Sequence, residues 1–402
     1  MILLLGYQGY VVGINGVAAP FIAKSFGLGD AGIATLYAWI SLAAIGALVL
    51  SRWADRVGRR RVLLLCVTAT PVAALAAALA PSLLLFATCG IVLNAFIGAT
   101  MSGSVVMLAE ELPIAQRARG QSWGGLAVGF GAGLCVLGMP ALAAGGYSWR
   151  WLLAAAGLGV LLLPLLHRIV PESTRWERAA ADGATARGGF LRVFHPAHRA
   201  RAIPVLICAL LGNVATTASN NWTFYHAESV IGLSATVASA LVATSGAVGM
   251  AGFPLAAWSC ERFGRVPTVS VASVLLAMSS LAFYWGPPTA FLWPTLWLGF
   301  ANLWFTVATS MAMVGNNAAI TELFPTTIRN TMVGWFALVT AVGNVSAQAL
   351  IALLAGPLGG LSAVVGYLAL LAVPSAAVFA LFVDETRGLS LEAAAGEEIG
   401  VG

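Results

Sequence analysis

Long apolar runs separated by short polar loops dominate this chain of 402 residues. A run of about 20 apolar residues, folded as an α-helix, crosses the roughly 30 Å hydrocarbon core of a bilayer. Twelve such runs lie at residues 1–22, 32–50, 62–80, 83–108, 121–143, 150–166, 203–226, 235–258, 267–285, 291–320, 331–354 and 362–383. They lack the alternation of barrel strands, and only helices or closed barrels satisfy backbone hydrogen bonds in lipid. The sequence therefore predicts an all-α polytopic membrane protein with 12 transmembrane helices.

Composition and charge set the environment and orientation of these helices. The chain is 60% hydrophobic and 9% charged, whereas soluble domains carry roughly 25% charged residues. Lipid must therefore be the solvent for most of the surface. All of the 20 Lys and Arg residues except Lys24 and Arg150 fall on one side of the predicted array. The positive-inside rule places that side, with the C-terminus, in the cytoplasm, and we expect a bacterial inner (plasma) membrane.

Other classes of protein find little support in the chain. The net charge of +5 follows from the loop asymmetry, so we expect no nucleic-acid partner. The five cysteines lie in or beside apolar helices without metal-ligand spacing and are predicted to be small core residues. No nucleophile elbow or phosphate loop occurs, so we expect no enzymatic activity, cofactor or metal. We also expect the protein to be a monomer. Met1 opens the first run without a signal peptide's basic flank, and a start upstream stays open.

The chain contains an internal repeat, because several polar landmarks recur about half a chain later. At an offset of 206, the sequence matches Asp55, Arg56, Gly58 and Arg59 with Glu261, Arg262, Gly264 and Arg265. At offsets of 205, 212 and 213, it matches Gly27 with Gly232, Glu110, Pro113 and Arg117 with Glu322, Pro325 and Arg329, and Glu172 with Glu385. We therefore predict two pseudo-symmetric six-helix bundles, at residues 1–170 and 203–386, with a linker at 171–202 and a tail at 387–402.

Two further patterns bear on packing and on the membrane surface. Gly125, Gly129 and Gly133 recur every four residues in the fifth run, which predicts close helix approach there. The linker ends in GGFLRVFHPAHRAR, which mixes apolar and basic residues. That mixture predicts a segment lying on the anionic leaflet, so membrane lipid is an expected partner; a regulatory or partner-binding site is the alternative.

The loop DRVGRR at 55–60, the block PESTRW at 171–176 and the tail DETRGLSLE at 384–392 are distinctive. A Glu-x-x-Pro-x-x-x-Arg pattern also follows the fourth and tenth predicted helices. Together these motifs resemble the major facilitator superfamily, and within it the sugar porters and metabolite–proton symporters. Ser51 and Asp384 stand where the family patterns carry glycine and proline. The resemblance covers the whole chain and implies two bundles that rock about a central site.

The charged motifs are predicted to gate this movement by breaking and remaking ion pairs. Asp55 sits among arginines at a helix end, and Gly58 permits a tight turn between two helices. The alternative is that these charges only set the topology. The predicted gating residues are Asp55, Arg56, Gly58, Arg59, Glu110, Glu111, Arg117, Glu172, Arg175, Glu261, Arg262, Arg265, Glu322 and Arg329.

Polar side chains inside the runs are candidates for the substrate path, since they are costly in lipid and tend to face the bundle interior. The resemblance implies a cavity lined by helices 1, 4, 7 and 10. The candidates are Gln8, Asn15, Asn94, Asn213, Thr217, Asn220, Asn221, Tyr225 and Asn317, with Asn344 and Gln348 noted on helix 11. Each amide could instead hold helices together. Asn221 and Tyr225 match a sugar-porter motif, but its paired glutamines fall on Ala215 and Thr216.

Proton coupling has weaker support in the residues. Proton symporters of this type commonly carry an acid early in helix 1, where this chain has Gln8. His226 and Glu228 are the titratable pair nearest the path and form a candidate proton relay; the alternative is that both are exposed at a helix end. We predict a secondary transporter of a small polar metabolite, such as a sugar or organic acid, coupled to protons. An uncoupled facilitator and a ligand sensor without net flux are the alternatives.

Overall fold

The computed structural model describes the backbone of residues 1–111, 114–170, 190–286, 294–324 and 326–387. Within these ranges every regular element is a helix. Among the described residues, 12 helical segments are long and apolar enough to cross a membrane, which confirms the predicted number. The predicted domain boundaries, 170/171, 202/203 and 386/387, stay predictions.

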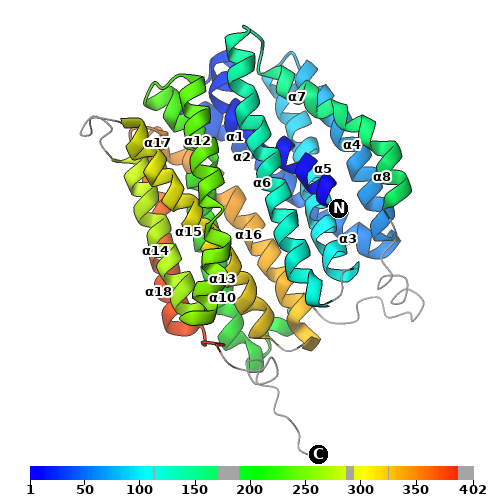
Figure 1. The fold of residues 1–402 in the computed structure, drawn as a ribbon, viewed down its shortest axis with the longest axis vertical. Helices are drawn as coiled ribbons and strands as arrows, with labels where there is room; N and C mark the ends of the chain where they lie inside the picture. The colour runs from blue at the N-terminus through cyan, green and yellow to red at the C-terminus, as the bar shows by residue number, and fades with distance from the viewer. Residues whose placement is uncertain (112–113, 171–189, 287–293, 325, 388–402) are drawn as a thin grey trace, which may run out of the picture. The chain divides into compact units, whose positions relative to one another are not determined.

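The described helices group into two compact units. The first unit contains residues 227–240 and α1 (Ile2–Phe26), α2 (Asp30–Ser41), α3 (Ala43–Val57), α4 (Arg59–Leu79), α5 (Leu83–Glu111), α6 (Ile114–Ala144), α7 (Arg150–Gly157), η1 (Leu158–Leu162) and α8 (Leu163–Ile169). The second contains η2 (Phe190–Phe194), α10 (Pro196–Asn221), α11 (Thr223–Tyr225), His226 of η3 (His226–Val230), the end of α12 (Ala235–Gly249), α13 (Gly252–Arg262), α14 (Arg265–Tyr284), α15 (Pro294–Glu322), α16 (Thr326–Leu354), α17 (Leu361–Ala369) and α18 (Ala372–Phe382). In the second unit α14 packs against both α15 and α18 (Figure 1).

The predicted repeat is visible in the local backbone of both halves. The second and eighth spans are each broken into two helices, α2–α3 and α12–α13, and the sixth and twelfth are broken likewise. Gly58 and Gly264 both have positive φ, 114° and 107°, where α4 and α14 begin. Gly27 and Gly232 repeat the same feature with φ of 64° and 81°. Such values favour glycine, so the repeated glycines mark repeated turns.

Glycine packing in the first unit differs from the prediction. Beyond the backbone of α6 itself, no described atom lies within 4 Å of a Cβ built on Gly125 or Gly133, so no close helix contact forms at these two residues within the first unit. The contact between α1 and α6 instead runs through Gly9, Gly13 and Gly131. A Cβ on Gly131 would lie 2.7 Å from the backbone nitrogen of Tyr10 and would overlap the Gly6 carbonyl. The four-residue spacing gave no information about which face of α6 meets α1.

Gly131→Ala is expected to destabilise the first unit, because the added methyl must displace α1 backbone. Overpacking of this kind costs about 1–3 kcal/mol. Thermal unfolding in detergent should show a transition several degrees lower than that of the natural chain. Gly133→Ala is the matched control on the same helix and should leave the midpoint unchanged or slightly raised, since alanine favours helix. Equal shifts for the two variants would contradict the assignment of the contact.

Candidate functional site

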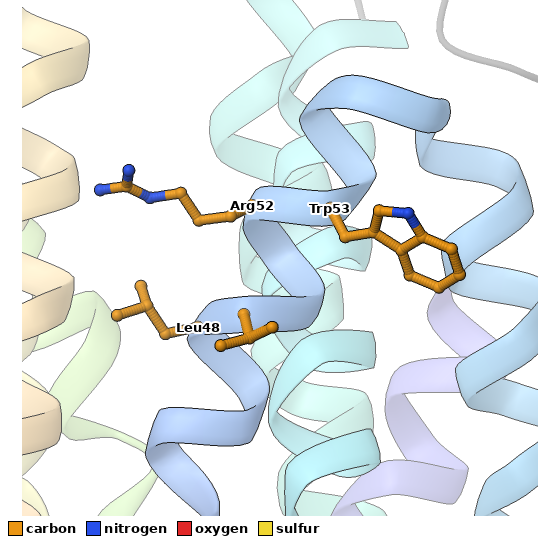
Figure 2. A pocket seen from close by; sticks show the side chains of 4 residues that line it. Leu48, Arg52 and Trp53 are labelled. Atoms are coloured by element: carbon orange, nitrogen blue, oxygen red, sulfur yellow. The ribbon is translucent and has the colours of Figure 1, made fainter.

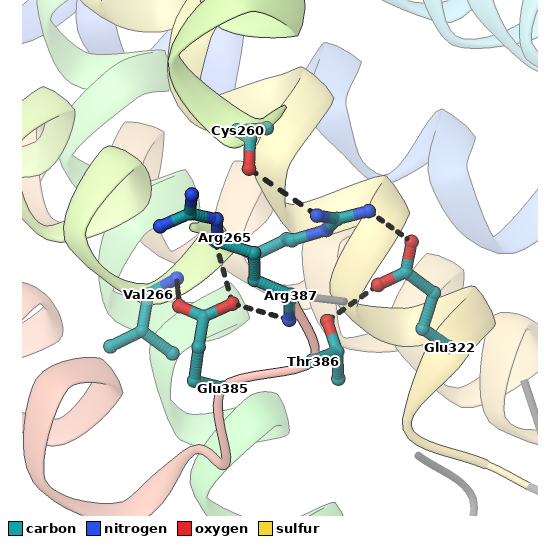
Figure 3. A network of polar contacts seen from close by, with 7 residues as sticks. All are labelled: Cys260, Arg265, Val266, Glu322, Glu385, Thr386 and Arg387. Carbon is teal, nitrogen blue, oxygen red and sulfur yellow. Dashed lines mark hydrogen bonds and ion pairs between the residues drawn. The ribbon is translucent and has the colours of Figure 1, made fainter. Parts of the chain in front are cut away.

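A polar network in the second unit surrounds the start of α14 (Figure 3). Arg265, the first residue of α14, donates to the Glu322 carboxylate at 2.9 Å and to the Cys260 carbonyl at 3.3 Å. Thr386 donates its hydroxyl to the other Glu322 oxygen. The guanidinium and the carboxylate are both mostly buried, so each stabilises the charge of the other. Helices α13, α14 and α15 are thereby tied to the segment after α18.

Glu385 caps the start of α14. Its carboxylate accepts hydrogen bonds from the backbone N–H groups of Arg265 and Val266, at 3.0 and 2.9 Å, and from that of Arg387 at 2.9 Å. The first N–H groups of a helix lack partners inside it and carry partial positive charge, so a carboxylate there is stabilising. A Cβ on Gly264 would lie 2.6 Å from the Glu385 carboxyl carbon, so glycine also leaves room for this cap.

The structure brings some predicted gating residues together and separates others. Arg265 pairs with Glu322, as an ion-pair gate requires. Arg262 instead lies over the rings of Trp258 and Phe263, and Glu261 is exposed. Glu385 was not among the predicted gating residues, although its sequence equivalence to Glu172 was a usable signal.

The equivalent end of the first unit is described in part. Gly58 makes the turn, and the neighbouring Arg60 donates to the carbonyls of Val170 and His167 at 2.7 and 3.0 Å, which caps the end of α8. Arg59 starts α4 and is partly buried. Of the other predicted gating residues, Glu172 and Arg175 lie outside the described residues. The side chains of Asp55, Arg56, Glu110, Glu111, Arg117 and Arg329 also lie outside the description.

A pair of amides lies at the middle of two spans in the first unit. Asn15 of α1 donates to the Asn94 side-chain carbonyl of α5 at 2.9 Å, and Asn94 donates to the Gly90 carbonyl at 2.9 Å. The Tyr37 hydroxyl donates to the Asn15 backbone carbonyl. Both amides are only half-buried, so they keep hydrogen-bonding capacity toward a third group.

The second unit carries a comparable cluster where α10 packs on α16. The Thr217 hydroxyl is 2.6 Å from the Asn344 side-chain oxygen and 3.3 Å from that of Asn213. Asn344 is exposed at the middle of its span, Thr331–Leu354. Gly343 lets the two helices approach here, because a Cβ on it would lie 3.1 Å from the Asn213 side chain. Asn344 was noted on the sequence but not included among the path residues, since nothing local links it to Thr217.

The remaining predicted path residues have different settings. Gln8 is fully buried, and neither amide atom has a hydrogen-bond partner among the described residues. Asn220 and Asn221 are exposed at the end of α10, and Tyr225 is buried edge-on against Trp222 with ring centroids 5.6 Å apart. Asn317 is exposed three residues before the end of the span Thr295–Ile320. The strongest polar groupings are therefore those of Asn15 and of Thr217.

His226 and Glu228 bond to different partners. The His226 Nδ1 atom is 2.7 Å from the Ser362 hydroxyl, and the buried ring packs against Phe283 and Tyr284. Glu228 forms an ion pair with Lys24 of α1 at 2.6 Å and accepts from the Ser229 hydroxyl at 2.7 Å. Both lie on η3, a π-helical turn. The structure shows no hydrogen bond between the His226 and Glu228 side chains along which a proton could pass directly.

A shallow hollow of about 450 Å³ lies along α3, lined by Leu48, Val49, Arg52 and Trp53. Figure 2 shows Leu48 and Arg52 on one side of the helix and Trp53 on the other. It contains none of the predicted path residues. In the part of the chain that the structure describes, no three His, Cys, Asp or Glu side chains gather as metal ligands would.

Comparison with known proteins places the fold and motifs in one family. The model of the Major Facilitator Superfamily matches residues 1–343. The chain belongs to the Major Facilitator Superfamily. Its predicted family is thus confirmed, and so is the predicted all-helical fold with 12 candidate spans.

Curated relatives are named as transporters of small metabolites. The chain is 32% identical over 176 residues to a gallate transporter of Pseudomonas putida, a match that covers 43% of this chain and 39% of that protein. It is 24% identical over 369 residues to a gentisate transporter of Corynebacterium glutamicum, covering 87% and 78%. A crystal structure of a D-xylose–proton symporter superposes with a TM-score of 0.75 at 20% identity, covering 97% and 98%. The two curated transporters support the predicted class of function, transport of a small metabolite, and the superposed structure shows the same fold.

Glu385→Ala is expected to loosen the first turn of α14, because two backbone N–H groups lose their acceptor. Loss of a helix cap costs about 1 kcal/mol, so amide hydrogen exchange around Arg265 and Val266 should quicken about fivefold. Hydrogen-exchange mass spectrometry measures this directly. Asp384→Ala is the matched control, since the Asp384 carboxylate pairs with Arg201 at 3.1 Å and does not contact α14's N–H groups. Unchanged exchange in Glu385→Ala would contradict the capping role.

Proposed function

We propose that the protein is a secondary transporter that moves a small polar metabolite by alternating access, and that the mid-span polar clusters bind it. The observation that carries this proposal is the position of those clusters. Asn15, Asn94, Thr217 and Asn344 all lie near the middle of spans that are otherwise largely apolar, and three of the four side chains are half-buried or exposed. Polar groups that only held helices together would gain by full burial, as Asn302 and Ser245 are buried.

The first substrate class to test is small organic acids, with sugars second. Asparagine amides and a threonine hydroxyl can hydrogen-bond a carboxylate or a hydroxyl group. In the described spans every Asp, Glu, Lys and Arg lies within three residues of one end. No described acidic side chain therefore repels an anion at mid-span. Gallate and gentisate, named for two relatives, are organic acids.

Proton coupling forms part of the proposal, and uncoupled facilitated diffusion is the second candidate. The named D-xylose–proton symporter supports coupling in this fold. One observation favours the facilitator: the groups at mid-span are amides and a hydroxyl, which do not titrate in the physiological range. His226, held by Ser362, is a buried histidine nine residues after Thr217 on the chain.

Arg265, Glu322, Glu385 and Thr386 form the proposed gate on the side that the positive-inside rule assigns to the cytoplasm. Their bonds join segments distant in sequence within the second unit, and any movement of α14 relative to α15 would break the Arg265–Glu322 pair. Such a pair has two discrete arrangements, made or broken, as a conformational switch requires.

The proposal is tested by counterflow into liposomes that contain the purified protein. Vesicles preloaded with unlabelled gentisate, gallate, xylose or an amino acid receive the labelled compound outside, with and without an inward proton gradient. We expect exchange of an organic acid, stimulated by the gradient. Exchange insensitive to the gradient would indicate the facilitator, and binding without exchange a sensor; exchange of none of the compounds would contradict the proposed substrate classes.

Thr217→Val should weaken substrate binding while keeping side-chain shape, because the hydroxyl that orders Asn344 is lost. A hydrogen bond contributes about 0.5–1.5 kcal/mol, so the KM for counterflow should rise roughly 3- to 10-fold. Thr340→Val is the matched control, since its hydroxyl bonds only within α16, to the Ala337 carbonyl. An unchanged KM in Thr217→Val would remove this cluster from the binding site.

A further inference from the structure

Gln348 of α16 is a buried amide in the second unit. It is 1% exposed, and its Oε1 atom has no hydrogen-bond partner among the described residues. Asn302, another buried amide of this unit, donates instead to the Ser245 hydroxyl at 2.6 Å. A buried acceptor without a donor is unfavourable, and native proteins keep few of them. Beside a binding site, such an acceptor suits a donor group on the ligand.

Gln348 lies one helical turn beyond the polar cluster of Thr217. Helices α10 and α16 pack together and share one hydrophobic cluster near their first turns, and further along both helices Thr217 bonds to Asn344. The two helices therefore run in the same direction. At the next turn of each, four residues on, stand Asn221 of α10 and Gln348 of α16. Gln348 thus shares a face of α16 with Asn344 and is level with Asn221.

The levels of Asn344 and Gln348 differ in the hydrogen bonds that they can make. Asn344 is exposed, and its amide N–H groups can donate to a carboxylate, which itself only accepts. The Gln348 oxygen also only accepts, so a hydroxyl group can satisfy it and a carboxylate cannot. The two levels are one turn, about 5.4 Å, apart along the helix axis. A carboxylate and a hydroxyl on non-adjacent carbons of one ring span a distance of this order.

We propose that Gln348 determines the specificity of the substrate site, a role that rests on the transport function proposed above. The Gln348 oxygen accepts a hydrogen bond from a hydroxyl group of the substrate, while the substrate carboxylate binds at the level of Thr217 and Asn344. The substrate is then a hydroxy acid whose two groups stand about one helical turn apart. An acid without that hydroxyl leaves the buried oxygen without a donor, and a site built to bond a hydroxyl rejects such an analogue.

The test titrates the full-length protein in detergent with 3-hydroxybenzoate, 2-hydroxybenzoate and benzoate, and isothermal titration calorimetry gives the Kd of each. We expect 3-hydroxybenzoate to bind roughly 3- to 10-fold more tightly than the other two, as one further hydrogen bond allows. Gln348→Met keeps the side-chain length and should abolish this preference while leaving the Kd of benzoate unchanged. Its unfolding temperature should equal or exceed that of the natural chain, because the variant removes an unpaired buried acceptor.

Ser346→Ala is the matched control on α16, because residue 346 is turned about 200° away from Gln348, and it should keep the preference. Equal affinity of the natural chain for the three acids, or a preference that survives Gln348→Met, would overturn the role of Gln348. Exchange of benzoate in counterflow would still support the proposed transporter in those cases.

A second variant and a further outcome complete the test. If Gln348→Met fails to fold, Gln348→Asn decides, because it withdraws the acceptor by one methylene and should reduce the preference for 3-hydroxybenzoate. An unchanged preference in Gln348→Asn would overturn the role of Gln348. Absence of binding by all three acids would overturn that role and also organic acids as the first substrate class.

Discussion

The structure depends on one constraint, which is that hydrocarbon offers no hydrogen-bond partner to a polar side chain. A polar group in the middle of a span must therefore bond inside its own bundle or face water. Asn15 forms a hydrogen bond with Asn94, and Thr217 with Asn344; each bond joins two different helices. These pairs leave part of each amide open. The same requirement that places the amides in pairs leaves them able to bind a hydroxyl or carboxylate that enters from water.

The same constraint explains why the charged side chains of the described spans lie at the ends of the spans. Arg265, Glu322 and Glu385 meet where α14 begins, and the turn that allows this needs the positive φ of Gly264. An ion pair at a span end costs little to solvate when it breaks, unlike one in mid-membrane. In the proposed mechanism the apolar interior stays rigid through close glycine contacts, such as that of Gly131 in α6 with α1, while the charged end changes partners. The proposal thus assigns binding to the middle of the spans and gating to their ends.

The sequence alone was sufficient to predict features that depend only on the order of residues along the chain. Span number follows from hydropathy, and the repeat from landmarks such as Gly58 and Gly264, whose φ values agree. Features that need a helix's rotation about its axis were not predictable. Spacing alone pointed to Gly125 and Gly133, but α6 turns Gly131 toward α1. The partner of Thr217 was missed for the same reason, because 127 residues separate it from Asn344. His226 and Glu228 are only two residues apart on the chain, but the helical turn directs their side chains to different neighbours.

Substituted-cysteine labelling of Asn344 tests most directly whether the mid-span cluster faces water. Asn344 and Val342 are both exposed on α16, and their side chains point about 200° apart, since successive residues turn by about 100°. With the five natural cysteines replaced, a membrane-impermeant thiol reagent should modify Asn344→Cys, and a transported substrate should slow that reaction. Val342→Cys should react far more slowly, because an exposed valine in the middle of an apolar span is expected to face lipid rather than water. A cysteine at 344 that no impermeant reagent reaches, or that substrate leaves unprotected, would contradict a water-filled path through these amides.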